Sequence, residues 1–238
     1  MSKTRPIALE RMVGYHDLVA DLQHLGCPIC RGADRSAWRY LGGLLWESVT
    51  DPGVRMGLRA SHGYCREHSL LLLRVASAEV GSLGLSILLE DLLHHVLADA
   101  ELETAQKASR RHTGPLQPEA PCGACVVVRR TEETHVSVLA AAEPGSLPYE
   151  GIRREGRGIC VPHMRVGLAL LADAEHRGRF LDAFRHGTNE LTHELSEFGR
   201  KHDYRFHDEG MTHGEATSWQ RGVYRLVGEP KPTREPPR

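Results

Sequence analysis

The sequence has few lysines and few aromatic residues, and neither sign of charge dominates it. Lysines are Lys3, Lys107, Lys201 and Lys231, whereas arginine supplies the rest of the 30 basic residues, and 31 acidic residues bring the formal net charge to −1. A general polyanion binder usually has a basic surplus, which is missing here. Aromatic residues make up 5% of the 238 residues, too few for surfaces that stack on single-stranded nucleic acid. A nucleic-acid partner is therefore not expected.

Long apolar runs are also missing. The most apolar stretch, residues 69–100, is interrupted by Arg74, Glu79, Glu90 and Asp91, whereas a membrane-spanning helix needs about 20 consecutive apolar residues. Residues 1–23 contain several charges and no apolar core of signal-peptide length. We expect a cytoplasmic protein without a membrane partner, in which thiols stay reduced unless they are catalytic or bound to metal.

The cysteines that are present follow a repeat. They lie in four short motifs: C-P-I-C (Cys27 and Cys30), C-R-E-H (Cys65 and His68), C-G-A-C (Cys122 and Cys125) and C-V-P-H (Cys160 and His163). Each residue of the last two motifs lies 95 positions after its counterpart in the first two, and no cysteine is left over. Gly63 and Gly158 precede the two Cys-x2-His motifs at the same offset. The pattern indicates an internal duplication of a C-x2-C-x34-C-x2-H unit.

Metal binding explains this unit. A C-x2-C or C-x2-H pair brings two ligands to one ion from a single turn, and two pairs complete the tetrahedron typical of zinc. If Cys65 and Cys160 begin helices, His68 and His163 lie one turn further along the same faces. The positive end of each helix dipole would favour the cysteine thiolate. We expect all eight Cys and His residues of the four motifs to bind zinc, two ions per chain.

Three other interpretations of the cysteines remain. An iron–sulfur cluster usually has four cysteine ligands, with histidine less common. Dithiol redox chemistry would suit C-P-I-C and C-G-A-C but leaves the matched Cys-x2-His motifs unexplained. Buried cysteines without any ligand would not need eight positions in duplicate.

Four protein ligands leave no open coordination position, so each zinc is expected to be structural and not catalytic. Sequence order would join Cys27 and Cys30 to the Cys-x2-His motif at 65–68. This adjacent pairing closes the shorter loop and is favoured by entropy. The alternative is a swapped arrangement that uses the Cys-x2-His motif of the other half.

Apolar spacing predicts helices along almost the whole chain. The expected helices span residues 8–25, 33–49, 65–79, 83–110, 122–142, 160–175 and 179–202. Asp51-Pro52-Gly53 is expected to end the second of them, and residues 143–158 are expected to form a loop. The predicted fold is all-α, with two pseudo-symmetric helical halves, residues 1–112 and 122–228, each pinned by a Cys3His site. Residues 113–121 are expected to link the halves, and residues 229–238 to form a disordered tail.

The segment from Lys201 to Trp219 has no counterpart in the first half. It could form the lip of a ligand pocket, or a third metal site from His202, His207 and a carboxylate. The simpler interpretation, which we prefer, is a solvated helix end and a loop in which Tyr204, Phe206 and Trp219 anchor to the core. The adjacent His94 and His95 point to different sides of a helix and are expected to be polar surface residues.

The duplicated C-P-x-C and G-x-C-x-x-H motifs are followed by E-F-x-R-K-H-D-Y-R-F at 197–206 and S-W at 218–219. This combination resembles an uncharacterised bacterial family of helical, cysteine-rich proteins, from about residue 15 to residue 228. C-G-A-C departs from the pattern by lacking the proline, which does not affect ligation. The resemblance supports the metal ligands and implies no reaction, and it implies that the C-terminal segment belongs to the domain.

These observations predict a zinc-stabilised helical protein that binds an unknown protein or small-molecule ligand and is not itself an enzyme. No phosphate-binding glycine loop and no motif with a free nucleophile was found. The alternative is a redox protein that uses the cysteines as dithiols or as iron–sulfur ligands.

Overall fold

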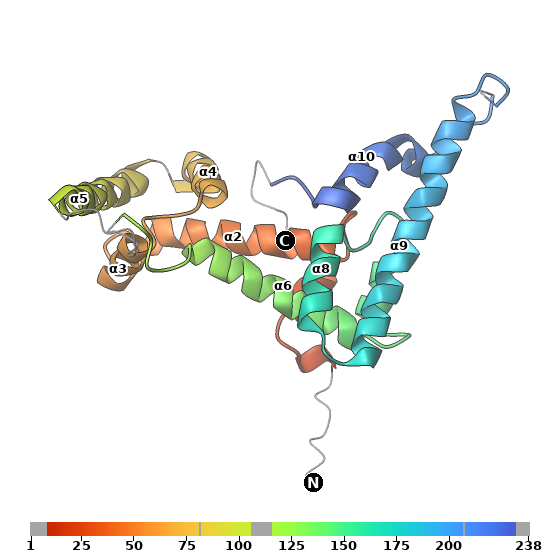
Figure 1. Ribbon diagram of the computed structural model, residues 1–238. Helices are drawn as coiled ribbons and strands as arrows, with labels where there is room; N and C mark the ends of the chain where they lie inside the picture. The colour runs from red at the N-terminus through yellow and green to blue at the C-terminus, as the bar shows by residue number, and fades with distance from the viewer. Residues whose placement is uncertain (1–8, 81, 106–115, 207, 232–238) are drawn as a thin grey trace, which may run out of the picture. The chain divides into compact units, whose positions relative to one another are not determined.

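The computed structural model describes residues 9–80, 82–105, 116–206 and 208–231, which form helices and no strand (Figure 1). In chain order the elements are η1 (Leu9–Arg11), α1 (Tyr15–Asp21), α2 (Pro28–Glu47), α3 (Pro52–Ala60), α4 (Arg66–Val75), the π-helical turn η2 (Ala76–Val80), α5 (Leu83–Ala105), α6 (Gly123–Ala141), α7 (Leu147–Ile152), α8 (Val161–Leu170), α9 (Ala174–Lys201) and α10 (His213–Val227). The all-α prediction is confirmed. Among the described helices, none is both long and apolar enough to cross a membrane.

Local sequence explains where several helices begin. Asp51 accepts a hydrogen bond from the Val54 amide at 2.8 Å, and Pro52 occupies the first turn of α3. The Asp51-Pro52-Gly53 stretch therefore starts a helix as well as ending the previous one. Thr212 begins α10 through a capping box, in which Thr212 and Glu215 each accept a hydrogen bond from the other's backbone amide.

Two predicted elements have different bounds in the structure. The helix expected over residues 8–25 is divided into η1 and α1 by Gly14, which has a φ of 79°. A Cβ at Gly14 would lie 2.4 Å from Cγ2 of Thr134, so close packing also requires glycine here. The loop expected over residues 143–158 contains α7, which begins after Ser146 with Pro148 in its first turn.

The chain forms two compact units, and each contains residues from both repeats. Unit 1 includes the described residues up to 33 and residues 130–230, and unit 2 includes residues 34–129 with Lys231. The boundaries therefore fall inside α2 and α6 and not at the predicted linker, residues 113–121. Part of that linker is fixed within unit 2, because the Glu119 and Ala120 amides both donate to the Ala60 carbonyl.

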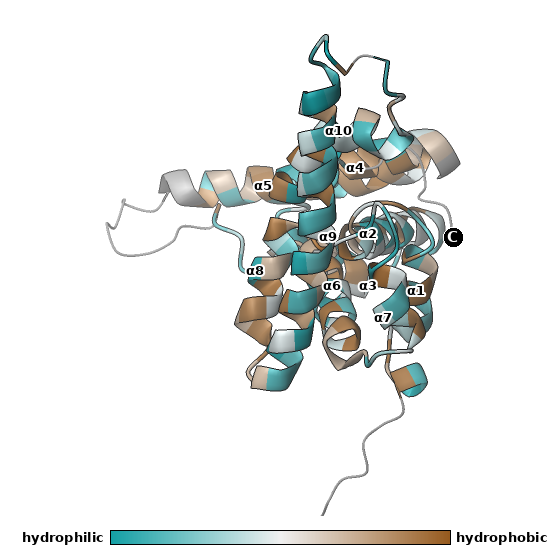
Figure 2. Cartoon of the chain, turned by 90° about the vertical axis from the view of Figure 1, so that its right-hand side faces the viewer, coloured by the Kyte–Doolittle hydropathy of each residue, from teal (hydrophilic) through white to brown (hydrophobic). Residues whose placement is uncertain are grey.

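Each unit has its own apolar core. The largest fully buried apolar side chains of unit 1 are Leu18, Leu22, Ile29, Val136, Ile152, Ile159 and Phe180. Those of unit 2 are Trp38, Leu41, Leu71 and Val75. α9 bears hydrophilic residues along much of its length (Figure 2) and buries Phe180, Ala183 and Leu191 in unit 1. Burial of these side chains is the main source of each unit's stability.

Candidate metal centres

All four cysteine motifs lie at helix N-termini. Cys27, Cys65, Cys122 and Cys160 each come directly before the first residue of a helix, α2, α4, α6 and α8 respectively. The second ligand of every motif follows three residues later, in the first turn of the same helix. The prediction that Cys65 and Cys160 begin helices is confirmed, and neither side chain is used as a helix cap. The helix dipoles thus favour thiolates at all four motifs.

Glycine allows the chain to turn sharply before α4. Gly63 has a φ of 86°, in the left-handed region that other residues rarely adopt. A Cβ at this position would also lie 2.8 Å from Cδ2 of Leu92. The glycine two residues before Cys65 therefore has a structural cause.

The motifs combine across the two repeats. Centre 1, in unit 1, consists of Cys27, Cys30, Cys160 and His163, and centre 2, in unit 2, consists of Cys65, His68, Cys122 and Cys125. The four ligand atoms of each centre lie within 4.8 Å of one another. The adjacent pairing favoured by loop entropy is wrong, and the swapped arrangement is present. The entropy argument assumes a flexible loop, whereas the 20-residue helix α2 follows Cys27 directly and is about 30 Å long.

The distances in centre 1 fit a single tetrahedral ion. Nδ1 of His163 lies 3.1, 3.4 and 3.6 Å from the sulfurs of Cys160, Cys30 and Cys27. The Cys30 and Cys160 sulfurs are 3.7 Å apart. Zinc at its usual bond lengths separates two sulfurs by about 3.8 Å and a sulfur from a nitrogen by about 3.6 Å. A disulfide requires about 2.0 Å, and all six cysteines are free.

Centre 2 has nearly the same geometry. Nδ1 of His68 lies 3.2, 3.3 and 3.6 Å from the sulfurs of Cys65, Cys125 and Cys122. The Cys65 and Cys125 sulfurs are 3.7 Å apart. Its three cysteines are partly exposed, whereas all three cysteines of centre 1 are buried. Each centre can hold a metal ion. Centre 2 is the more accessible of the two to solvent.

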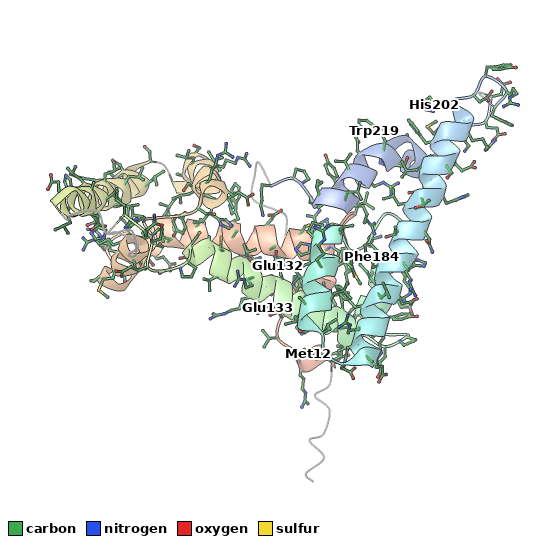
Figure 3. All side chains as sticks on the ribbon, viewed as in Figure 1. Met12, Glu132, Glu133, Phe184, His202 and Trp219 are labelled. Atoms are coloured by element: carbon green, nitrogen blue, oxygen red, sulfur yellow. The ribbon has the colours of Figure 1, made fainter. Side chains whose placement is uncertain are left out.

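The two histidines differ in their outer hydrogen bonds. Nε2 of His163 lies 3.1 Å from Oε1 of Glu132, so the ring donates there and its Nδ1 faces the three sulfurs. Glu132, labelled in Figure 3, lies on α6. Metal-bound histidines commonly make such a bond to a carboxylate, which orients the ring. Nε2 of His68 is buried and has no hydrogen-bond partner among the described residues. The residue 95 positions before Glu132 is Ala37, which explains the difference.

Charges and burial shift the pKa values in centre 1. Burial opposes ionisation of the Cys27 thiol, but hydrogen bonds from Cys160, Cys30 and His163 outweigh it and lower the pKa of Cys27. Burial also opposes the charged form of His163, yet hydrogen bonds to Cys160, Cys27 and Glu132 raise its pKa to about 12. These shifts favour the thiolate form of Cys27 and the protonated form of His163. A bound metal cation would neutralise the negative charge of the cysteine thiolates in the same way.

In centre 2 the pKa shifts are of a different kind. Burial raises the pKa of Cys125 to about 12, helped by its hydrogen bond to Cys65. Burial lowers the pKa of His68, and the positive charge of Lys231 adds to this effect. A neutral His68 has a free lone pair on one ring nitrogen, as metal ligation requires.

The C-terminal segment covers centre 1. The Glu229 amide donates to the Cys30 sulfur at 3.4 Å, and Oε1 of Glu229 accepts from the Cys27 amide at 3.2 Å. Arg225 on α10 donates to the carbonyls of Arg157 and Ile159, just before Cys160. These contacts could not be predicted from the sequence, because residues 225–229 lie outside the duplicated motifs.

The alternative of a third metal site within residues 201–219 is not supported, because no such group of ligands forms among the described residues. His202 is exposed and bonds through Nδ1 to the Phe198 carbonyl at 2.7 Å, and His207 lies outside the described residues. Lys201 instead pairs with Glu215 at 2.8 Å. The core-anchor interpretation is wrong for two of its residues, because Tyr204 is 81% exposed and Trp219 is 52% exposed.

The fold and the two centres place this chain in the class of all-helical proteins that have Cys3His groups able to hold metal ions. It has two such groups. The chain belongs to a family of unknown function, DUF6062, whose profile matches residues 17–232. This result confirms the resemblance to an uncharacterised family. No curated protein and no solved structure matches the chain.

Proposed function

We propose that this protein binds one zinc ion at each of centres 1 and 2 and that both ions are structural. The convergence of four protein donors on one point, in each centre, carries the proposal. Three cysteines and one histidine form a donor set typical of structural zinc, and no position remains for water or substrate. Iron–sulfur chemistry is less well supported, because ligands shared between several irons would be spread more widely than ligands of one ion.

The zinc ions would join segments that are distant in sequence. In centre 1, Cys30 and Cys160 are 130 positions apart, and in centre 2, Cys65 and Cys125 are 60 positions apart. A metal that binds only the folded chain stabilises it, since its binding free energy adds to the free energy of unfolding. We further propose a cytoplasmic location, where thiols remain available to zinc.

The remaining surface supports a binding or scaffold role, with a protein or small-molecule partner. Trp219, Val223 and Leu226 are 52%, 52% and 66% exposed. They are spaced by four and three residues on α10 and so share one face of the helix. An exposed apolar face of this kind is common at binding sites.

Metal analysis of anaerobically purified protein, with an absorption spectrum of the same sample, tests the proposal. Two zinc ions per chain without visible absorption are expected. Iron with a broad visible band would replace the proposal by the iron–sulfur alternative. Metal-free protein with titratable thiols or disulfides would replace it by dithiol chemistry.

A further inference from the structure

Unit 2 contains a third group of metal-ligating side chains, away from the cysteines. Oδ2 of Asp99 lies 3.1 Å from Nε2 of His62 and 3.4 Å from Nε2 of His95. One ligand atom from each residue falls within 4.8 Å of both others. The three side chains are 14%, 15% and 35% exposed for Asp99, His62 and His95, so an ion in solvent can reach them.

We propose that His62, His95 and Asp99 form an open binding site for a divalent transition-metal ion. Two imidazoles and one carboxylate suit zinc and iron(II), and they bind calcium or magnesium poorly. Three protein ligands leave at least one coordination position for water or for an added ligand. This distinguishes the site from centres 1 and 2, where the protein supplies all four donors.

The backbone holds His62 in an unusual conformation. It has a φ of 48°, and among the described residues it is the one non-glycine with positive φ. The His62 amide donates a hydrogen bond to the Arg59 carbonyl, and the Gly63 amide donates one to the Leu58 carbonyl. His62 and Gly63 are thus two successive left-handed residues just after the end of α3. This conformation costs free energy. It places His62 beside His95 and Asp99, which lie four residues apart on one face of α5.

A separate ion pair fixes α3 against α5. Nε of Arg59 lies 3.0 Å from Oδ2 of Asp91, and Arg55 lies 3.4 Å from Oδ1 of the same carboxylate. Asp91 is two helical turns before Asp99. The elements therefore remain attached if one member of the proposed site is replaced, which allows binding and folding to be tested separately.

An apolar cavity of about 240 Å³ adjoins the proposed site. His62 lines it together with Tyr64, Leu88 and Leu92. Leu88, Leu92, His95 and Asp99 follow one another at three- or four-residue spacing along α5, so the apolar stripe leads to the ligands. Room therefore exists beside the metal for a molecule with an apolar body and a donor group.

The duplicated half does not repeat this site. The positions 95 residues after His62, His95 and Asp99 hold Arg157, Glu190 and Glu194. Arginine is not a metal ligand, and Arg157 donates to the Leu22 and Gln23 carbonyls. Glu194 is paired with Arg221 at 2.5 Å. The proposal therefore adds one ion per chain and not two.

Cobalt(II) titration of the full chain tests the proposal, followed by absorption spectroscopy and calorimetry. Cobalt at centres 1 and 2 gives strong sulfur-to-metal charge-transfer bands, whereas cobalt bound by nitrogen and oxygen gives only weak visible bands. We expect one further equivalent of cobalt without charge transfer. His95→Gln and Asp99→Asn should each lower its affinity at least tenfold, because loss of even an outer hydrogen-bond partner of a metal ligand typically costs about 10–100-fold.

His94→Gln is the matched control, because His94 neighbours His95 but is outside the group, and it should leave the further equivalent intact. Circular dichroism and thermal melting of each variant check that the helices persist. Wild-type protein that binds cobalt only with charge transfer would overturn the proposal. So would a further equivalent that survives both His95→Gln and Asp99→Asn. If zinc already fills centres 1 and 2, wild-type protein that binds no cobalt would equally overturn the proposal.

Discussion

The sulfur of Cys30 lies 3.7 Å from the sulfur of Cys160, 130 residues further along the chain. The same distance separates Cys65 from Cys125 in the other centre. Each pair joins a Cys-x2-Cys motif of one repeat to a Cys-x2-His motif of the other. The repeats therefore exchange half-sites, and neither repeat can complete a centre from its own ligands. A change in either repeat should affect a centre shared by both.

Glu132→Gln should weaken zinc binding at centre 1. Glu132 orients His163 by accepting a hydrogen bond from Nε2 at 3.1 Å, and loss of such a partner typically reduces metal affinity by about 10–100-fold. Competition with a chromophoric chelator measures the change. Glu133→Gln is the control, because Glu133 is the next residue on α6 whereas the ring of His163 bonds to Glu132. Equal affinities in the two variants would contradict the role of Glu132.

Zinc should leave centre 2 before centre 1. The cysteines of centre 2 are partly exposed, and its His68 lacks the outer hydrogen bond that His163 has. Stopped-flow release to excess chelator should therefore show two phases of equal amplitude. Cys122→Ser should abolish the fast phase and Cys160→Ser the slow one. A single phase that both substitutions halve would show that the centres are equally labile.

Chelation should lower the thermal stability of the protein. Zinc bound only to the folded state adds its binding free energy to the free energy of unfolding, so metal removal lowers Tm. Differential scanning calorimetry before and after anaerobic chelator treatment measures the shift, and re-addition of zinc should reverse it. An unchanged melting curve after complete metal loss would mean that the centres do not stabilise the fold.

Glu215 should remain ionised to a lower pH than an ordinary glutamate. A hydrogen bond from Lys201, with Oε2 2.8 Å from Nζ, lowers the pKa of Glu215. Since the folded-state pKa is the lower one, the pair stabilises the fold above the unfolded pKa of about 4.3. This stabilisation is lost as pH falls through the folded-state pKa.

NMR titration of the Glu215 carboxyl carbon measures this shift directly. Lys201→Met should raise the pKa of Glu215 toward its ordinary value, whereas Lys231→Met should not, because Lys231 pairs with Asp34 at 3.0 Å. A Glu215 pKa that is the same in wild type and Lys201→Met would contradict the pairing.

The sequence was sufficient to predict the helices and to single out the eight Cys and His residues that form the two groups, because duplication and ligand spacing are local patterns. It could not predict the pairing. Loop entropy favours the near partner only for a flexible chain, and Cys30 is instead followed by most of the rigid helix α2. Pairing is decided by packing between distant segments, which no local pattern records.

Contacts made by residues outside the repeated motifs could not be predicted from the sequence either. Glu229 reaches Cys27 and Cys30 from a segment without a counterpart, so the 95-residue period could not reveal it. His62 is 37 positions from Asp99, and only the four-residue spacing of His95 and Asp99 was a usable signal. That signal is weak, because His and Asp at this spacing are common on exposed helices.

Paired cysteine substitutions test the exchange of half-sites most directly. The readout is sulfur-bound cobalt per chain, counted by its charge-transfer absorption. Because Cys30 and Cys160 share a centre, the double variant Cys30→Ser/Cys160→Ser should retain one ion. Cys30→Ser/Cys65→Ser should retain none, because it damages both centres. The reverse result, with none bound in the first variant and one in the second, would show that the half-sites pair within each repeat.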